Sequence, residues 1–428
     1  MIQFMTLTNV SHKRDKPKPK CRICHEELVD RVLDLGVQPL SGVFLHDAHQ
    51  STEIFPLVLF CCSNCNLVQL GESVSLTEMY GDSYGYRSGL NTTMIEHLRE
   101  VASQIRSRIS FECDTPVVLD IGSNDGTFLH NFDKNVFTRI GMDPSAQKFL
   151  EFYDEDIKVI VDFFSKDAYS LSEKNRPELI TSIAMFYDLQ DPIQFAKDIH
   201  ELLVEGGHWY LEVCYGPWVA GMGAFDTICH EHLEYYSLEN LDLICKKVGF
   251  NVVHTLVSNS NGVSIGLLLQ KDSHNPEESS VQDNVFTWLL EVEKRNSLNS
   301  SAAWRKSAEL VQEKKNELNK LISEIKTSGK TIYGMGASTK GNILLNYLGL
   351  TANDITAIGE VNFAKLGKYM PGSRIPIISE EEVLAAMPDY ILFLPWHFRS
   401  FAIKKYAKYI ESGGKLIFPL PMLEIHGK

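Results

Sequence analysis

The 428-residue sequence lacks several features that define common classes of protein. No apolar run approaches the ~18 residues that a membrane-spanning helix needs, and the sequence does not open with the charged-then-apolar pattern of a secretory signal. Positive charge is also in deficit, because 41 Lys and Arg stand against 55 Asp and Glu, for a net charge of −14. Nucleic-acid partners require a basic face that replaces phosphate counterions. These absences predict a soluble, cytoplasmic protein without a nucleic-acid or membrane partner.

The nine cysteines are expected to be thiols or metal ligands, because nothing indicates an oxidising compartment. Four of them form two C-x-x-C pairs, Cys21 with Cys24 and Cys62 with Cys65. Two such pairs suit tetrahedral Zn²⁺, so a structural zinc site is predicted. The neighbouring Cys61 and His25 leave the ligand set open. A thioredoxin-like redox pair is the weaker alternative, because two pairs are present.

The most informative segment is an apolar strand, Val117–Ile121, followed by a glycine-rich turn. We expect this turn to open a helix. The turn does not match G-x-G-x-x-G, so it favours S-adenosylmethionine over a dinucleotide. The alternative is an ordinary strand end of an α/β protein. The residues expected to bind the methyl donor here are Asp120, Gly122, Ser123, Asn124, Asp125 and Gly126.

Two further strands are expected to complete the donor site. The first, 138–143, ends in Asp143 about 20 residues after the turn, where a carboxylate can accept hydrogen bonds from a ribose diol. The second, 159–161, precedes Asp162 and Phe163, which are predicted to hold the adenine. The alternative is that Phe163 belongs to the hydrophobic core.

Strands and helices then alternate, which predicts a mostly parallel, doubly wound α/β sheet. A pair of later strands around Asn261-Gly262 is expected to form an antiparallel hairpin at its edge. The elements expected in this part are strands at 179–186 and 208–213, a helix at 192–203, and hairpin strands at 250–257 and 263–270.

A second group of chemically active side chains is His230, Glu231 and His232. An imidazole tuned by a carboxylate is the usual general base near neutral pH. A zinc site is the weaker interpretation, because helical zinc ligands are spaced i, i+4. The alternative without chemistry is a polar loop over the cleft. Tyr84 and Tyr86 lie in an earlier Tyr- and Gly-rich loop and are candidate hydrogen-bond donors to a ligand, or ordinary turn residues.

The C-terminal third is predicted to hold two helices, 281–293 and 302–326, and then a second small α/β domain. The segment 334–342 follows the first strand of that domain and opens a helix, so its backbone amides could hold a phosphate. The same loop leaves an NAD(P)-dependent oxidoreductase as an alternative function. Residues 396–399 follow a later strand, where open sheets place ligands.

Taken in order along the chain, these motifs resemble the sugar-nucleotide C-methyltransferases, which act on nucleotide-linked 4-keto deoxysugars. The resemblance implies a class I methyltransferase domain that binds S-adenosylmethionine, structural zinc at the cysteine knuckles, and His232 as the base beside the ketone. It also implies that Glu231 and a tyrosine of the early loop line the sugar. The motifs that carry it are 21–24 with 62–70, 84–88, 120–126, 230–237 and 336–342.

Three positions depart from the pattern of that family, and all three would border the substrate. Cys229 stands in place of a Tyr, Asp188 in place of a His, and Asn261–Ile265 in place of Gly-Gly-Ser-Leu-Arg. The nucleotide, the sugar and the methylated carbon therefore stay open, as does the oligomeric state.

The sequence thus predicts an α/β enzyme with a small zinc-binding module, a class I methyltransferase Rossmann-like sheet and a C-terminal Rossmann-like domain. Its predicted function is C-methylation of a nucleotide-linked 4-keto-6-deoxysugar, through deprotonation next to the ketone. A non-catalytic binding protein on a methyltransferase scaffold is a further alternative. The expected parts are a disordered tail at 1–18, the zinc module at 19–78, the methyltransferase domain at 79–275, a helical connector at 276–328 and the C-terminal domain at 329–428.

Overall fold

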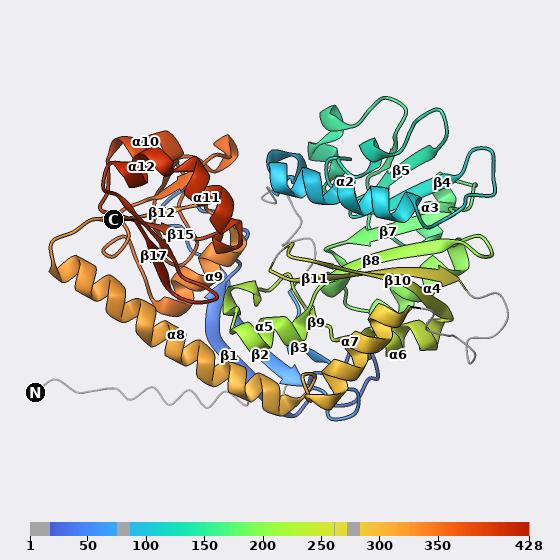
Figure 1. Ribbon diagram of the computed structural model, residues 1–428, viewed down its shortest axis with the longest axis horizontal. Coiled ribbons are helices and arrows are strands. Elements are labelled where there is room, and N and C mark those ends of the chain that lie inside the picture. The colour runs from blue at the N-terminus through green and yellow to red at the C-terminus, as the bar shows by residue number, and fades with distance from the viewer. Residues whose placement is uncertain (1–17, 75–85, 261, 272–282, 428) are drawn as a thin grey trace, which may run out of the picture.

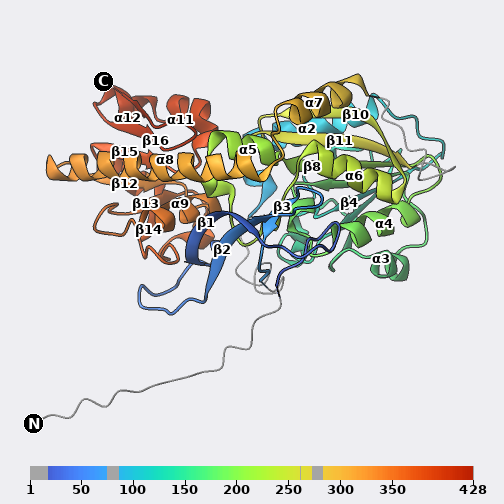
Figure 2. The same ribbon diagram turned by 90° about the horizontal axis from the view of Figure 1, so that it is seen from below.

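The computed structural model describes residues 18–74, 86–260, 262–271 and 283–427. Figure 1 shows two α/β lobes, with the N-terminal strands and the long helix α8 (Ser301–Thr327) beneath them. Seen from below in Figure 2, α8 runs under the C-terminal lobe towards the other one. The predicted α/β class with two Rossmann-like sheets and an N-terminal four-cysteine module is confirmed.

The largest sheet has seven strands in the order β10-β11-β8-β7-β4-β5-β6. Its pairs from β8 to β6 are parallel, whereas β10, β11 and β8 pair antiparallel, as expected for a hairpin at one edge. The strands are β4 (Val117–Ile121), β5 (Thr138–Met142), β6 (Lys158–Ile160), β7 (Leu179–Ile183), β8 (His208–Cys214), β10 (Phe250–Ser258) and β11 (Ser264–Lys271).

Both faces of this sheet are covered by helices, which is why four of the five residues of β4 are apolar, Asp120 being the exception. Val118 packs with α2 (Thr92–Arg106) on one face, whereas its neighbours Val117 and Leu119 pack with α4 (Pro192–Leu202) and α6 (Leu238–Val248) on the other. The helices begin at defined caps: the side chain of Asp191 accepts from Gln194 N–H at the start of α4, and Ser237 forms a capping box with Asn240 in α6.

The other two sheets belong to the N- and C-terminal parts. The four-stranded sheet, in the order β1-β2-β3-β9, contains β1 (Asp30–Pro39), β2 (Ile54–Cys61), β3 (Val68–Leu70) and β9 (Glu234–Tyr235). The six-stranded sheet, in the order β14-β13-β12-β15-β16-β17, contains β12 (Ile332–Met335), β13 (Ile358–Glu360), β14 (Ile377–Ser379), β15 (Tyr390–Phe393), β16 (Lys415–Phe418) and β17 (Glu424–His426).

Besides α8, the α-helices are α2 (Thr92–Arg106), α3 (Lys166–Ser172), α4 (Pro192–Leu202), α5 (Gly216–Met222), α6 (Leu238–Val248), α7 (Asn284–Arg295), α9 (Thr339–Leu348), α10 (Glu380–Ala385), α11 (Arg399–Lys405) and α12 (Ala407–Glu411). Short 3-10 turns lie at 88–90, 129–131, 146–148, 150–152, 186–188, 225–227, 363–365 and 396–398. No helix of the described ranges is long and apolar enough to cross a membrane.

One expectation about the donor turn is wrong. The turn after β4 does not open an α-helix, because only the 3-10 turn Leu129–Asn131 follows it. The Asn131 side chain donates to the carbonyl oxygens of Thr127 and Phe128, which satisfies these groups without a further helical turn. The strand expected at 179–186 also ends earlier, at Ile183, since 186–188 forms a 3-10 turn.

A continuous hydrophobic core joins the N-terminal sheet, α8 and the C-terminal sheet. Leu33 and Leu59 of the N-terminal strands pack in the same cluster as Val311 of α8 and Ile358 of the C-terminal sheet. Phe225, five residues before His230 in the sequence, belongs to this cluster as well. The N-terminal strands, α8 and the C-terminal sheet therefore share one core, and this core also packs against the segment that leads to His232.

Candidate active site

The turn after β4 is built around two glycines and forms part of the wall of a cavity. Gly122 and Gly126 have φ angles of +74° and +76°, a region that favours glycine, and a Cβ at Gly126 would come within 2.8 Å of Tyr153. The Tyr153 hydroxyl donates to the carbonyl oxygen of Asn124 at 2.9 Å and lies 2.8 Å from Ser123 Oγ. The turn is thus fixed from within, and Gly122, Ser123 and Asn124 line a cavity.

Asn124 and Asp125 hold a neighbouring loop rather than offering their side chains freely to a ligand. Asn124 donates through Nδ2 to the carbonyl oxygen of Tyr86 at 3.1 Å, and its Oδ1 accepts from Ser88 N–H at 2.9 Å. Asp125 Oδ2 accepts from Gly89 N–H at 2.9 Å and lies 3.2 Å from Arg87 Nε. Asp125 and Gly126 do not line the cavity, whereas Tyr86 does.

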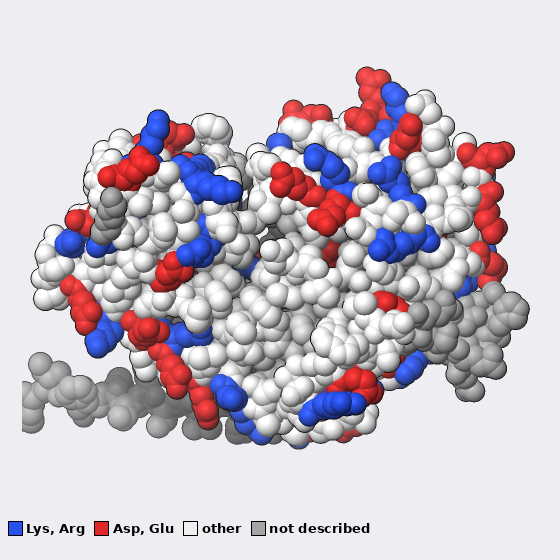
Figure 3. All heavy atoms as spheres, viewed as in Figure 1, with Lys and Arg blue, Asp and Glu red and all other residues white. Residues whose placement is uncertain are grey.

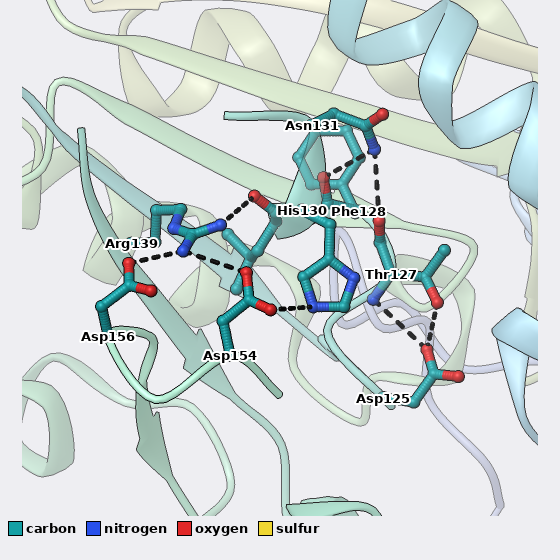
Figure 4. Close-up of polar contacts among 9 residues, drawn as sticks. Asp125, Thr127, Phe128, His130, Asn131, Arg139, Asp154 and Asp156 are labelled. Atoms are coloured by element: carbon teal, nitrogen blue, oxygen red, sulfur yellow. Dashed lines mark hydrogen bonds and ion pairs between the residues drawn. The ribbon is translucent and has the colours of Figure 1, made fainter. Parts of the chain in front are cut away.

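The segment beyond the turn is anchored from β5, on the side shown in Figure 4. The guanidinium of Arg139, only 3% exposed, lies 3.1 Å from Asp154 Oδ2 and also pairs with Asp156. Asp154 Oδ1 in turn lies 3.8 Å from His130 Nε2. These contacts stabilise the scaffold of the turn, and none of these four side chains lines the cavity.

Two acidic side chains face the donor end of the cavity. Burial raises the pKa of Asp120 to about 7, although its carboxylate accepts from the Thr181 hydroxyl at 2.6 Å. Asp143, which follows β5 directly instead of ending it, accepts from Asn124 N–H at 2.9 Å and from the backbone and hydroxyl of Ser145, both at 2.6 Å. Part of the acceptor capacity of Asp143 is therefore used within the turn itself.

The structure separates the two residues predicted to hold the adenine. Phe163 lines the cavity and is 39% exposed, so it is not a core residue. Asp162 is exposed and does not line the cavity. Its carboxylate instead accepts from the N–H of Phe163 at 2.8 Å.

His232 lies in the wall of the same cavity, in a fixed orientation. Its Nδ1 is 2.8 Å from the carbonyl oxygen of Thr227, and because a carbonyl only accepts, Nδ1 carries the proton and Nε2 keeps its lone pair. The Tyr187 ring packs edge-on against the imidazole, with ring centroids 4.5 Å apart. Burial, together with the charge of Lys340, lowers the pKa of His232 to about 4. The side chain is thus a neutral base at pH 7.

The neighbours of His232 point in different directions. Glu231 lines the cavity. Its Oε2 accepts a hydrogen bond at 3.1 Å from the hydroxyl of Ser41, a residue that lies just after β1. His230 is 2% exposed and lies away from the cavity, with Nε2 3.2 Å from the carbonyl oxygen of Phe55 in β2. The structure therefore brings Glu231 and His232 together at the cavity, but not His230. Tyr84 and Asn261 lie outside the described residues.

The C-terminal lobe closes the cavity from the other side. Lys340, in the first turn of α9, lines it, and its charge acts on His232, on Cys214 and on Asp226. Asp226 is fully buried and accepts from the indole N–H of Trp396 at 2.6 Å. Of the residues 396–399 that were predicted to lie near a ligand, His397 and Phe398 line the cavity. Trp396 does not, and instead holds the 3-10 turn that carries Thr227. No sequence signal links residues 170 positions apart.

The glycine loop of the C-terminal lobe resembles the donor turn, because both contain a glycine with a positive φ and are held by a carboxylate from the next strand end. Gly336 has a φ of +88°, and a Cβ there would come within 2.5 Å of Pro395. Glu360, at the end of β13, accepts from the N–H groups of Ala337 and Val361 at 2.9 Å and 2.8 Å, as Asp143 does in the other sheet. The Lys365 ammonium donates to the carbonyl oxygen of Ala337 at 2.8 Å. The helix that was expected to follow this glycine loop is confirmed as α9.

These elements surround one cavity of about 860 Å³ between the two lobes. It extends from the donor turn past His232 to the C-terminal glycine loop. The N-terminal module contributes Gly42 and Phe44, which sequence reasoning did not anticipate. The cavity also contains two of the three family departures, Asp188 and Cys229. The predicted site residues that line it are Tyr86, Asp120, Gly122, Ser123, Asn124, Asp143, Phe163, Glu231 and His232.

The four predicted cysteines form a second site. Their sulfur atoms all lie within 4.8 Å of one another, with 3.5 Å between Cys21 and Cys65 and 3.4 Å between Cys24 and Cys62. A tetrahedron of Zn–S bonds of about 2.3 Å has edges of about 3.8 Å, so this cluster fits Zn²⁺. Cys61 is not part of the cluster.

Lys and Arg are interspersed with Asp and Glu on the face of the molecule shown in Figure 3.

Comparison with known proteins identifies three family models along the chain. Residues 94–255 match the family model "Methyltransferase domain", 259–421 match "C-methyltransferase C-terminal domain", and 21–80 match "Putative zinc binding domain". The chain is 28% identical over 411 residues to the C-methyltransferase NovU of Streptomyces niveus, covering 95% of this chain and 96% of that protein.

Solved structures with a similar partial fold include a carbon methyltransferase, CurJ, with a TM-score of 0.35 and 14% identity, covering 44% of this chain and 57% of that chain. Another is the N-methyltransferase NodS of Bradyrhizobium japonicum in complex with S-adenosyl-L-homocysteine, with a TM-score of 0.32 and 13% identity, covering 43% of this chain and 89% of that chain.

The fold, the cavity and the family matches define an S-adenosylmethionine-dependent methyltransferase. More particularly, the chain is a C-methyltransferase with an N-terminal zinc-binding domain, a central methyltransferase domain and a C-methyltransferase C-terminal domain. This finding replaces the oxidoreductase and the binding-protein alternatives.

Proposed function

We propose that this enzyme methylates a carbon next to the ketone of a nucleotide-linked 4-keto-6-deoxysugar, with His232 as the general base. The observation that carries the proposal is the fixed tautomer of His232, whose Nδ1–H is engaged by Thr227 in the wall of the central cavity. Carbon methylation needs a carbanion equivalent, and a proton next to a ketone is the most accessible source of one. A neutral imidazole is suited to remove that proton.

The methyl donor would be held by Gly122, Ser123 and Asn124 of the turn, with Asp120, Asp143 and Phe163 around them. The glycine geometry supports this assignment, because Gly122 lines the cavity at a φ of +74°, where a side chain would be strained and its Cβ would come within 3.2 Å of Met185. Asp125, Gly126 and Asp162 act through the scaffold in this proposal, since they do not line the cavity. S-adenosylmethionine supplies an electrophilic methyl group on a sulfonium when bound.

The chain itself provides the proton transfer and the stabilising charge. Nε2 of His232 takes the proton from the carbon, whose C–H electron pair becomes the enolate. His232 then carries a positive charge near Lys340, and the single negative charge of the enolate formed at the same time is stabilised by these two cations. Tyr86, and Tyr84 as predicted from the sequence, would donate hydrogen bonds to the enolate oxygen. Holding the reactants together in the closed cavity supplies much of the acceleration.

The nucleotide end of the substrate is assigned to the C-terminal lobe. Three lysines, Lys340, Lys365 and Lys405, line this end of the cavity. Two of them pair with carboxylates that also line this end, Lys405 with Glu380 at 2.6 Å and Lys365 with Glu360 at 3.8 Å. A diphosphate would bind here to Lys340 and to the positive end of the helix dipole in the first turn of α9.

The test is mass spectrometry of reactions that contain S-adenosylmethionine and a panel of nucleotide 4-keto-6-deoxysugars, run in parallel in heavy water. A product heavier by one methylene is expected with at least one sugar, and deuterium is expected to enter the sugar without the donor. If no sugar of the panel gains either mass, the proposed substrate class is wrong. In a parallel melting experiment, protection by a nucleoside diphosphate but not by NAD is expected.

A further inference from the structure

The segment that carries His232 continues directly into the sheet of the cysteine module. Leu70 of β3 donates its N–H to the carbonyl oxygen of Leu233 at 2.8 Å. The next two residues form β9, where Glu234 pairs with Gln69 and Tyr235 pairs with Val68. The residues after the candidate base therefore pair as a strand with the sheet of the zinc module. They also contact the methyltransferase domain, because Leu233 N–H donates to the carbonyl oxygen of Tyr187 at 2.7 Å and Gly216 N–H donates to that of Tyr236 at 2.8 Å.

A buried ion pair lies at the centre of this junction. Arg22, between the ligands Cys21 and Cys24, has its Nε 3.2 Å from Oε1 of Glu234, and the two side chains are only 9% and 0% exposed. The carboxylate of Glu234 has no further hydrogen-bond partner among the described side chains and backbone groups. A buried carboxylate depends on its paired charge, so the position of Glu234 is set by Arg22.

Arg22 is itself held firmly by the module. Its Nη1 donates to the carbonyl oxygen of Leu70 at 3.0 Å and its Nη2 to the hydroxyl of Ser73 at 2.8 Å. Its backbone N–H donates to Oε1 of Gln69 at 2.9 Å. On the methyltransferase side, Nδ2 of Asn240 donates to the carbonyl oxygen of Cys65 at 2.8 Å. The knuckle therefore has a defined geometry relative to the residues that follow His232.

We propose that Arg22 is a positioning residue for the base: it transmits the geometry of the four-cysteine knuckle through Glu234 to His232, two residues earlier. This inference rests on the proposed role of His232. The zinc site in this view orders the active site as well as its own module. Fixing the Leu233–Tyr235 backbone keeps His232 facing the cavity, while the carbonyl oxygen of Thr227 holds its Nδ1.

The test uses the full-length enzyme with Arg22→Met, which removes the charge and keeps most of the side-chain length. Amide hydrogen–deuterium exchange is measured by mass spectrometry over 228–237, together with zinc content, S-adenosylmethionine affinity and, with an accepted sugar, kcat and KM. The matched control is Arg31→Met, since Arg31 lies in the same module but forms an exposed pair with Asp34, 58% and 50% exposed.

Arg22→Met is expected to exchange faster over 228–237 and to lower kcat by about tenfold or more, with donor affinity and zinc content unchanged, because small displacements of a catalytic group are costly. Arg31→Met should match the wild type in all readouts. Unchanged exchange over 228–237 in Arg22→Met would overturn the inference, even if activity fell.

A second variant decides the case in which Arg22→Met misfolds or releases its zinc. Glu234→Gln leaves the knuckle untouched, and faster exchange over 228–237 in this variant supports the positioning pair, whereas unchanged exchange overturns it. The exchange measurement needs no substrate. If the wild type methylates no keto sugar while Arg22→Met still exchanges faster, the proposed function fails and the positioning pair stands.

Discussion

The Nδ1 atom of His232 lies 2.8 Å from the carbonyl oxygen of Thr227, five residues earlier in the chain. Thr227 follows Asp226, whose buried carboxylate accepts from Trp396 of the C-terminal lobe at 2.6 Å. The orientation of the candidate base is therefore fixed by contacts that start in a different lobe. This arrangement, with the four-cysteine cluster, gives four predictions.

Replacing His232 with Gln is expected to abolish proton abstraction and to lower kcat by about 10²- to 10⁴-fold, the usual contribution of a positioned base. Binding of S-adenosylmethionine should not change, because the donor turn lies on other elements. Turnover, deuterium incorporation and donor affinity are the measurements. His49→Gln is the matched control, since His49 is exposed. Full activity of the His232 variant would assign the base elsewhere.

The pH dependence follows from the lowered pKa of His232, about 4 in the folded protein. A histidine in the unfolded chain titrates near 6.5. Between these values the unfolded chain binds the proton more readily, so the contribution of His232 to the free energy of unfolding falls as the pH decreases from about 6.5 to about 4.

For activity, the same shift keeps the base unprotonated well below neutral pH. Deuterium exchange into the substrate should therefore persist at pH 5.5 and decline only as the pH approaches about 4. A midpoint near 6.5 in the wild-type profile would contradict the lowered pKa of this buried imidazole in the free enzyme.

Trp396→Phe tests the contact between the lobes. The variant keeps an aromatic ring but leaves the Asp226 carboxylate without its indole donor, which is expected to cost about 1–3 kcal/mol of stability. Because Thr227 follows Asp226, kcat should fall more than donor affinity does. Denaturant unfolding and kinetics measure the two effects. Trp288→Phe, at a position that is 64% exposed in α7, is the control and should change neither. Equal stability of both variants would remove the assigned role of Trp396.

The cysteine cluster predicts one zinc ion for each chain. Cys24→Ser should lower the zinc content and the melting temperature, because three thiolates with a weak fourth ligand bind Zn²⁺ poorly. Cys113→Ser is the control, since Cys113 is exposed and lies outside the cluster. Metal analysis and melting curves with and without a chelator check the prediction. A full zinc complement in Cys24→Ser would point to a different ligand set.

The amino-acid sequence by itself determined the local parts of this enzyme. The apolar run of β4, the Gly122 and Gly126 turn, the two C-x-x-C pairs and the α9 loop each depend on neighbours within a few residues, so pattern and spacing suffice to predict them. The class of the fold followed from the alternation of these elements. The helix predicted after the donor turn failed because side-chain hydrogen bonds of Asn131 compete with helical ones.

Only the tertiary structure decided which of these residues share the cavity. His230 and His232 are two positions apart, and the sequence offers both as candidate bases. In the structure His230 contacts Phe55 of β2, whereas His232 lines the cavity. Ser41 on Glu231, Trp396 on Asp226 and Arg22 on Glu234 are contacts across 190, 170 and 212 positions. Such contacts depend on how whole lobes pack, because burial of the shared core, and not local propensity, fixes their relative position.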